Sequence, residues 1–359
     1  MIKSRVSRNL IEESVLTGNP IHVVVVGVGA FGRNHARVYR KLEQDGVPVH
    51  LLGVVDPDTD RADAVAREFD CRSFGSLEQL LATRQDVQAA SVAVPTIHHL
   101  STAKQLMEAG VDVLVEKPLA TSLAEADELA KLAEVNGRVV QVGHLERFNP
   151  AVRAVLPVIT QPMFFEVHRL SVFTPRSLDV DVILDLMIHD LDIVLSFVNS
   201  PVKEIRAVGL PILSGKTDIA NVRLEFESGC VANFTASRVS TERIRKLRFF
   251  QPRQYISLDY SRQDVLVFSV GGAEARQPSE NPQIGFAKLP VTAEEPLQAE
   301  LKSFLEAVQR RSRPVVSLED GRRALAVALE IVAAIRAHSQ QIHLDQLRGE
   351  LPHPSQHRA

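Results

Sequence analysis

Short runs of consecutive apolar residues alternate with helix-like stretches over residues 21–144 of the 359-residue chain. Apolar runs without polar alternation are typical of strands covered on both faces, as in a parallel sheet. Gly110 ends one helical stretch, and Ser122 with Glu125 forms a capping-box pattern before another. We therefore predict a doubly wound α/β domain. Its strands are expected within 22–29, 50–56, 87–95, 112–118 and 138–144, with a weaker strand near Cys71.

After residue 150 the pattern changes to longer β-rich stretches, at 163–173, 219–237 and 254–261. Their alternation of apolar and polar residues is typical of a sheet with one covered face and one open face. A hairpin is predicted around Ser228 and Gly229, and two helices, 296–311 and 318–338, close the chain. We predict an N-terminal extension, an α/β domain, a β-rich domain with helices and a tail, at residues 1–20, 21–144, 145–340 and 341–359.

Charge and composition exclude several classes of protein. Lysine and arginine number 41 against 44 aspartates and glutamates, a net charge of −3, which argues against a nucleic-acid binder with a basic face. No apolar run approaches the ~18 residues of a membrane span, and Glu12 and Glu13 stand where a signal peptide needs an apolar segment. Cys71 and Cys230 are isolated, which disfavours disulfides and thiolate metal sites. A cytoplasmic protein without membrane contact is expected.

Three glycines, Gly27, Gly29 and Gly32, form a GxGxxG motif (GVGAFG) between the first strand and the first helix. The first permits a tight turn, the second lets the backbone approach a diphosphate, and the third lets helix and strand pack closely. Asp56 follows 24 residues after Gly32, at the end of the next strand, where an acid binds ribose hydroxyls. The motif predicts a dinucleotide site. Glycines that serve only a turn are the alternative.

The carboxylate of Asp56 also bears on the choice of cofactor, because it repels a 2′-phosphate. NAD is therefore expected in preference to NADP. Arg61 lies five residues further on and could weaken this preference, although an exposed helix arginine is the simpler interpretation.

Lys117 stands in a Glu-Lys-Pro sequence at the end of the fifth predicted strand. Ligands of open α/β sheets bind outside the carboxyl ends of the strands, so a lysine here points at the crevice. Its ammonium group could hydrogen-bond a substrate hydroxyl or, with a lowered pKa, join a proton relay. A surface lysine beside a carboxylate is the alternative.

The stretch 181–198 reads as an apolar helix in which Asp181, Asp185 and His189 recur every four residues, with Asp192 three further on. These spacings place the polar groups on one face. Unpaired buried polar groups are costly, so the stripe should face a wet cleft or specific partners. Asp185 is expected to hold the imidazole and favour its protonated form, which suits a general base near neutral pH. A purely structural stripe is the alternative.

His98 and His99 follow the fourth predicted strand, beside Thr96, which could cap the next helix. One of these histidines is a candidate to line the cofactor crevice. No third ligand stands at a suitable spacing, so no metal site is expected.

At GVGAFG, EKPLA and DLMIHDLD the sequence resembles the glucose-fructose oxidoreductase/inositol dehydrogenase (Gfo/Idh/MocA) family, from Ile21 to about Ala337. The resemblance implies a Rossmann domain followed by an α+β domain whose open-faced, mainly antiparallel sheet commonly forms dimer or tetramer contacts. It implies that Lys117, Asp185 and His189 are catalytic, and that the bond from Lys117 to Pro118 is cis. The residues predicted to bind the cofactor are Gly27, Gly29, Ala30, Phe31, Gly32, Asp56, Pro95, Thr96, His99, Glu116 and Lys117.

Within this family, residues 140–152 and 168–192 look most like nucleotide-sugar dehydrogenases that oxidise the 3-hydroxyl of UDP-N-acetylglucosamine. In that reaction the 3-keto product passes to a partner aminotransferase, and the resulting 3-amino sugar enters lipid A or other surface glycans. Anion and sugar contacts are predicted from residues near the domain junction, although each arginine could instead pair with a carboxylate. These candidates are Arg147, Asn149, His168, Arg169 and Arg176.

Two other functions stay open. A dehydrogenase of another sugar, sugar acid or inositol fits the same motifs. A non-catalytic regulator that senses NAD or a sugar also occurs among relatives, but it gives no reason for the complete set of Lys117, Asp185 and His189. Which of His189 and Lys117 is the immediate base is also open.

Overall fold

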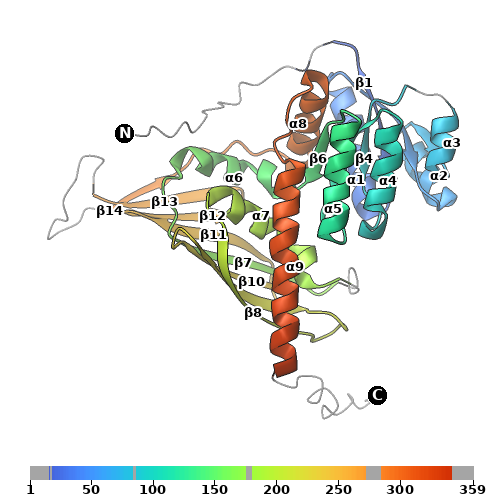
Figure 1. Ribbon diagram of the computed structural model, residues 1–359. Helices are drawn as coiled ribbons and strands as arrows, with labels where there is room; N and C mark the ends of the chain where they lie inside the picture. The colour runs from blue at the N-terminus through green and yellow to red at the C-terminus, as the bar shows by residue number, and fades with distance from the viewer. Residues whose placement is uncertain (1–15, 17, 84–85, 175–179, 272–283, 342–359) are drawn as a thin grey trace, which may run out of the picture.

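The computed structural model describes residues 16, 18–83, 86–174, 180–271 and 284–341, and every structural statement below concerns these residues. Most of the predicted N-terminal extension, Arg176 and the tail from residue 342 lie outside them. The chain forms two sheets, each belonging to one domain, and a long C-terminal helix runs alongside both (Figure 1).

The N-terminal sheet has six strands in the order β3-β2-β1-β4-β5-β6, and all pairs are parallel. In β1, Val23 and Val25 pack into one hydrophobic cluster, whereas Val24 and Val26 pack into another on the opposite face. Both faces are therefore covered, which explains the unbroken apolar runs and confirms the doubly wound prediction. The strands are β1 Ile21–Val26, β2 Val49–Val55, β3 Arg72–Phe74, β4 Ala89–Val92, β5 Asp112–Glu116 and β6 Val140–Gly143.

Helices α1 and α2 cover one face of this sheet, and α3, α4 and α5 cover the other. Their predicted ends are present: Gly110 has φ +85°, and the Ser122 hydroxyl accepts from the Glu125 amide at 3.3 Å. The Glu125 carboxylate bonds Thr121 instead of returning to Ser122. These helices are α1 Ala30–Gln44, α2 Thr59–Glu68, α3 Leu77–Ala82, α4 His99–Glu108 and α5 Leu123–Val135.

The second sheet has eight strands in the order β14-β13-β12-β11-β7-β10-β9-β8. Only the interior pair β7 and β10 is parallel, which confirms a mainly antiparallel sheet. Gly229, at φ +82°, forms the predicted hairpin turn between β9 and β10. The strands are β7 Phe164–Val172, β8 Val202–Leu210, β9 Ile219–Phe226, β10 Val231–Ser240, β11 Ile244–Gln251, β12 Gln254–Asp259, β13 Asp264–Val270 and β14 Ile284–Lys288.

One face of this sheet packs against helices, and the other is open. Along β11, Leu247 and Phe249 are fully buried in the core, whereas Phe250 is exposed. The covering segments are α6 Pro150–Val155, a π-helical turn Ile183–Met187 that runs into α7 Ile188–Phe197, and α9 Leu318–Gln341 (Figure 1). Three short 3₁₀ turns lie at Thr96–His98, Leu145–Phe148 and Leu156–Val158.

The last two helices tie the domains together. Helix α8, Pro296–Arg310, returns to the N-terminal domain, where Leu301 and Phe304 share a fully buried cluster with Tyr39 of α1. Helix α9 contacts α5 and β6 at one end and α7 and β8 at the other. A Cβ at Gly321 would lie 2.8 Å from Val142, so this glycine permits the close approach of α9 to β6. The sequence predicts one domain over residues 145–340. In the structure, α8 and the start of α9 leave the second sheet and pack against the N-terminal domain.

Among the described residues, every helix is too short or too polar to span a lipid bilayer.

Candidate functional site

The glycine loop after β1 leaves space at the N-terminus of α1. Gly27 has φ +84°, and a Cβ there would lie 2.8 Å from the backbone of Ala93. A Cβ at Gly32 would lie 1.8 Å from the carbonyl oxygen of Gly27, so only glycine lets helix and loop close. Nothing lies within 4 Å of the Cβ position of Gly29, and no side chain caps the helix. Free backbone amides beside open space fit a bound diphosphate.

Asp56, which is 3% exposed, joins the end of β2 to this loop. Its Oδ2 accepts from the Val28 amide at 2.8 Å, and its Oδ1 accepts from Arg61 Nη2 at 2.8 Å. Burial favours the protonated acid, but Arg61 and the backbone amides outweigh it and lower the pKa of Asp56. Arg61 is therefore a partner of Asp56, the acid predicted to bind ribose, rather than a free helix arginine.

The predicted residues after β4 lie at the same edge of the sheet. Pro95 directly precedes the turn Thr96–His98. Thr96 does not cap the next helix, because α4 begins directly after His98 and has no side-chain cap. His99 is 1% exposed, and its ring nitrogens each lie 3.0 Å from a backbone carbonyl oxygen, of Val94 and of Pro118. His99 thus links the end of β4 to the segment after Lys117, rather than presenting its ring to the crevice.

Glu116 points into the protein. Its Oε1 lies 3.1 Å from Nε2 of buried His35, and a Cβ at Gly143 would meet the carboxylate at 2.6 Å. The structure therefore brings Glu116 against α1 and β6, and the predicted cofactor contact by its side chain finds no support in this geometry.

Lys117, in the N-terminal domain, contacts Asp185 of the second domain. Its peptide bond to Pro118 is cis. Its Nζ donates to the Asp185 carbonyl at 2.7 Å and lies 3.6 Å from Asp185 Oδ1. Burial lowers the pKa of Lys117, and the Asp185 charge offsets part of that effect. A lysine with a lowered pKa can exchange a proton as well as donate a hydrogen bond.

His189 lies on α7, just after the π-helical turn. Its Nδ1 is buried and has no hydrogen-bond partner within the described part of the chain. Burial, together with the positive charges of Lys117 and Arg169, lowers the pKa of His189 well below its usual value. The imidazole is therefore neutral at pH 7, with one ring nitrogen that can act as an acceptor.

This arrangement corrects the prediction that Asp185 favours protonated His189. A π-helical turn changes the residue spacing from four to five, so groups four apart no longer face one another. Asp185 lies against Lys117, and Asp181 Oδ1 accepts from the Thr217 amide at 2.9 Å. The polar residues expected on one helix face therefore contact different partners. The pKa of His189 is lowered, whereas the prediction required it to be raised.

His144 is a site residue that the sequence analysis did not single out. It follows β6 directly and is 1% exposed, and neither ring nitrogen has a hydrogen-bond partner among the described residues. Burial lowers the pKa of His144, and the charges acting on it include those of Asp192 and Lys117. The rule that selected Lys117, proximity to the carboxyl end of a parallel strand, also applies to His144.

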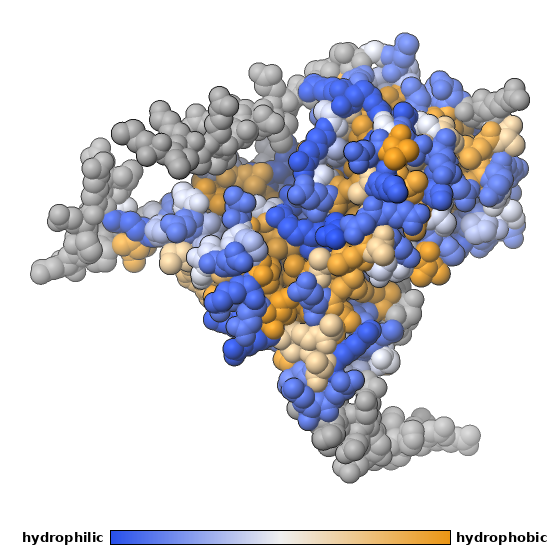
Figure 2. Space-filling view, viewed as in Figure 1, coloured by the Kyte–Doolittle hydropathy of each residue, from blue (hydrophilic) through white to orange (hydrophobic). Residues whose placement is uncertain are grey.

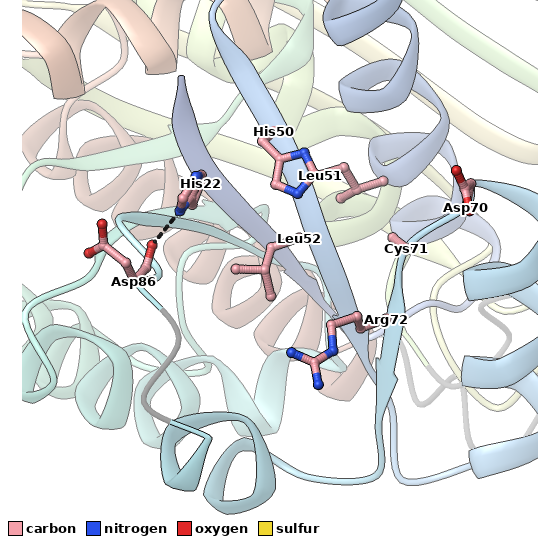
Figure 3. Close-up of a pocket in the computed structure, with 8 residues that line it drawn as sticks. All are labelled: His22, His50, Leu51, Leu52, Asp70, Cys71, Arg72 and Asp86. Atoms are coloured by element: carbon pink, nitrogen blue, oxygen red, sulfur yellow. Dashed lines mark hydrogen bonds between the residues drawn. The ribbon is translucent and has the colours of Figure 1, made fainter. Parts of the chain in front are cut away.

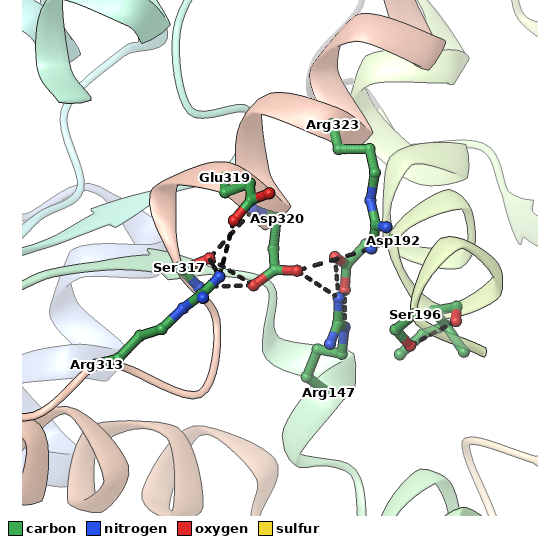
Figure 4. Close-up of polar contacts among 9 residues, drawn as sticks. Arg147, Asp192, Ser196, Arg313, Ser317, Glu319, Asp320 and Arg323 are labelled. Atoms are coloured by element: carbon green, nitrogen blue, oxygen red, sulfur yellow. Dashed lines mark hydrogen bonds and ion pairs between the residues drawn. The ribbon is translucent and has the colours of Figure 1, made fainter. Parts of the chain in front are cut away.

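Two predicted substrate arginines are held by carboxylates instead. Arg169 is 3% exposed and bonds Asp190 at 2.5 Å and Glu146 at 3.0 Å. Arg147 bonds Asp192 at 2.6 Å and lies 3.6 Å from Asp320 at the start of α9 (Figure 4). These ion pairs join α7, α9 and the turn Leu145–Phe148, so both arginines hold the junction together.

The other described residues that were predicted to contact the substrate do not face the site either. Asn149 is buried, caps α6 and donates to Glu146 and to the Tyr260 carbonyl, each at 3.1 Å. His168 lies next to Arg169 on β7, and adjacent strand residues point to opposite faces. His168 is therefore on the open face, away from His189. Arg176 lies outside the described residues.

A hollow of about 580 Å³ lies at the amino ends of β1, β2 and β3, beside His22, His50 and Arg72 (Figure 3). This edge is opposite the one that carries Gly27, Asp56 and Lys117. Ligands of open α/β sheets bind at the carboxyl ends, so this hollow is not the cofactor site. Within the described ranges, no three His, Cys, Asp or Glu side chains gather in a way that could hold a metal ion.

Two family models match the chain. One, an oxidoreductase family with an NAD-binding Rossmann fold, matches residues 21–144, and the other, the GFO/IDH/MocA C-terminal domain, matches residues 160–253. The chain is 36% identical over 318 residues to a UDP-N-acetylglucosamine 3-dehydrogenase of Acidithiobacillus ferrooxidans, covering 88% of this chain and 98% of that protein. A solved structure of that enzyme superposes with a TM-score of 0.80, at 35% identity and the same coverage.

More distant relatives act on inositols. The chain is 26% identical over 235 residues to scyllo-inositol 2-dehydrogenase (NAD(+)) of Bacillus subtilis, covering 61% of this chain and 68% of that protein. The structure of myo-inositol 2-dehydrogenase from Lactobacillus plantarum superposes with a TM-score of 0.73 at 17% identity, covering 89% of this chain and 98% of that one, which shows a shared fold.

Proposed function

The chain belongs to the Gfo/Idh/MocA oxidoreductase family and is a nicotinamide-dependent dehydrogenase, and from this premise we propose its substrate, cofactor and assembly. The proposed reaction is oxidation of the 3-hydroxyl of UDP-N-acetylglucosamine to a ketone, with NAD as the acceptor. The observation that carries it is the meeting of Lys117 and Asp185, from different domains, beside a neutral His189. The 36% identity to a UDP-N-acetylglucosamine 3-dehydrogenase over nearly its whole length supports the sugar.

In this proposal each residue of the site has its own role in the reaction. Bound NAD supplies the acceptor for the hydride that leaves C3 with both electrons of the C–H bond. His189, neutral because of its lowered pKa, accepts the hydroxyl proton as the carbon–oxygen double bond forms. Lys117 donates a hydrogen bond to the same oxygen and stabilises its developing negative charge. Asp185 holds the Lys117 ammonium group at the junction.

A substrate panel tests the reaction. Purified protein with NAD is mixed in turn with UDP-N-acetylglucosamine, its uronic acid, free sugars and inositols, and NADH absorbance is followed. An aminotransferase with glutamate is included to remove an unfavourable 3-keto product. Turnover of UDP-N-acetylglucosamine is expected. Turnover of inositol alone would overturn the nucleotide-sugar assignment, and binding of NAD and sugar without any turnover would favour a sensor.

The proposed preference for NAD rests on Asp56, and its pairing with Arg61 makes a specific prediction. Asp56→Asn keeps an acceptor for the Val28 amide but removes the charge that repels a 2′-phosphate and releases Arg61. The ratio of kcat/KM for NADP to that for NAD should rise about 10- to 100-fold, as expected for one charge-assisted hydrogen bond. Adding Arg61→Ala should abolish the gain. An unchanged ratio would exclude Asp56 from cofactor discrimination.

We further propose that the open face of the second sheet forms a contact between copies of the chain. Five aromatic rings form a row across it, with successive centroids 4.9–5.6 Å apart, on Phe164, Phe250, Tyr255, Phe268 and Phe286. Hydrophobic residues reach the surface near β14 (Figure 2), where Ile284 and Phe286 are 73% and 62% exposed. Contiguous apolar surface of this kind marks interaction sites.

Phe250→Glu tests this contact, because it places a charge in the middle of the row. The variant is expected to elute as a smaller species than the wild type, with the mass measured by light scattering. Val135→Glu is the control: Val135 is 74% exposed on α5, outside the sheet. Equal masses for all three proteins, with unchanged melting temperatures, would exclude the open face as the contact.

A further inference from the structure

Arg245 occupies a distinctive place at the start of β11. It pairs directly with Arg169 of β7, and both lie on the face that α7 covers, as do Leu247 and Val167. Unlike Arg169, Arg245 is exposed. It therefore stands where the covering helices end, at the rim of the site that contains His189.

The charge of Arg245 is not neutralised by the protein. The carboxylates beside it, Asp190 and Glu146, are already bonded to Arg169. The Arg245 side chain makes no ion pair or hydrogen bond to any residue that the structure describes. Because Arg169 already takes both carboxylates, the exposed guanidinium group of Arg245 keeps its donors for an anion from outside.

A small cavity of about 220 Å³ continues from this position and is mostly cationic. Its lining includes the cations Arg243, Arg245, Lys246 and Arg262 and the acids Glu242 and Asp259. Asp259 lies within 4.0 Å of both Lys246 and Arg262, and Lys246 stands opposite His168 on the open face. Arg243 and Arg245 are therefore the cations of this lining that Asp259 does not pair.

The strand register places Arg245 close to the reacting groups. Arg245 lies opposite Arg169, Arg169 bonds Asp190, and Asp190 directly follows His189 on α7. In agreement with this position, the positive charge of Arg245 is among those that lower the pKa of His189, after burial, Lys117, Arg169 and His144. In a nucleoside diphosphate sugar the diphosphate is attached two ring carbons away from the 3-hydroxyl. An anion site one sugar ring away from His189 is therefore what such a substrate requires.

We propose that Arg245, supported by Arg243 and Arg262, binds the diphosphate of the nucleotide-sugar substrate and holds the sugar against Lys117 and His189. This inference rests on the proposed function. Arginine suits the role because its planar guanidinium donates two parallel hydrogen bonds to phosphate oxygens.

The test measures UDP binding to the full chain with NAD present, by calorimetry, and kinetics with UDP-N-acetylglucosamine. Arg245→Gln should weaken UDP binding and raise KM about 10- to 100-fold, the range for a charge-assisted hydrogen bond, while kcat and NAD affinity change little. Arg262→Gln should weaken UDP binding less. Arg245→Lys, which keeps the charge, should recover part of the affinity. The control is Arg310→Gln, which removes an exposed charge from the end of α8.

The outcomes separate the two proposals. If the wild type binds UDP and correctly folded Arg245→Gln binds it equally well, the diphosphate site is wrong and the proposed reaction stands. If the wild type neither binds UDP nor oxidises a nucleotide sugar, both are wrong. Melting temperatures of the variants identify any loss that comes from unfolding.

Discussion

His189→Ala is expected to lower kcat about 100- to 10,000-fold, the range for loss of a general acid–base group. Lys117→Ala should cause a loss of similar size, because it removes the hydrogen bond to the reacting oxygen. The affinity for NAD should stay within about 3-fold of wild type for both variants, since neither side chain is assigned to the diphosphate or the adenosine ribose. Stopped-flow measurement of NADH formation and direct NAD titration check these two expectations.

A suitable control is His50→Ala, because His50 is exposed at the opposite edge of the N-terminal sheet, paired with Glu43 at 2.8 Å. It should keep the wild-type kcat. If both His189→Ala and Lys117→Ala keep nearly full turnover, the proposed site is wrong.

The pH profile of kcat/KM identifies the immediate base. The pKa of His189 is lowered well below 6.5 by burial and nearby positive charge, so a reaction that uses neutral His189 should show constant kcat/KM above neutral pH and lose activity only in acid. The pKa of Lys117 is lowered from 10.5 by burial. A reaction that needs neutral Lys117 would instead keep rising with pH in the alkaline range. The profile reports the free enzyme because it is taken from kcat/KM.

Arg169→Met is expected to destabilise the protein by about 3–5 kcal/mol, because it removes the positive charge that the buried carboxylates of Asp190 and Glu146 share. The melting temperature should fall by roughly 6–20 °C. Replacing Arg169, Asp190 and Glu146 together by apolar residues should recover much of this loss, since a whole buried ion cluster can be exchanged at little cost. Calorimetric melting checks both.

The matched control is Arg322→Met. Arg322 pairs with Asp127, but the two side chains are 43% and 56% exposed, so its loss should leave the melting temperature nearly unchanged. If Arg169→Met melts like the wild type and only raises KM, Arg169 contacts the substrate after all, and its structural assignment is wrong.

The elements of the fold were largely predictable because their signals are local. A run of four valines that must be buried on both faces indicates a central parallel strand, and Val23 to Val26 divide between the two faces as this requires. Gly110 and Gly229 mark a helix end and a hairpin because a positive φ is costly for other residues. The destination of α8 was not predictable, because an amphipathic helix does not specify which of two apolar surfaces it will cover.

The candidate site was only partly predictable for a related reason. Motif and strand-end rules located the glycine loop, Asp56, Lys117 and His189. The strand-end rule applies equally to His144, which was not singled out, but no local rule points to Arg245. The resemblance also offered Arg169 and Asn149 as substrate contacts, and the structure buries both in ion pairs and hydrogen bonds with Asp190, Glu146 and the Tyr260 carbonyl.

The sequence by itself therefore determined the parallel and antiparallel sheets, the dinucleotide loop and the residue types available at the junction, because each depends on neighbours within a few positions. Only the tertiary structure decided which charged side chains lie in contact. The π-helical turn places Asp185 against Lys117 rather than against His189. The strand register places Arg245 opposite Arg169, which is already paired with Asp190 and Glu146. Pairing and burial between distant segments set the protonation of these groups, and a linear pattern carries no measure of either.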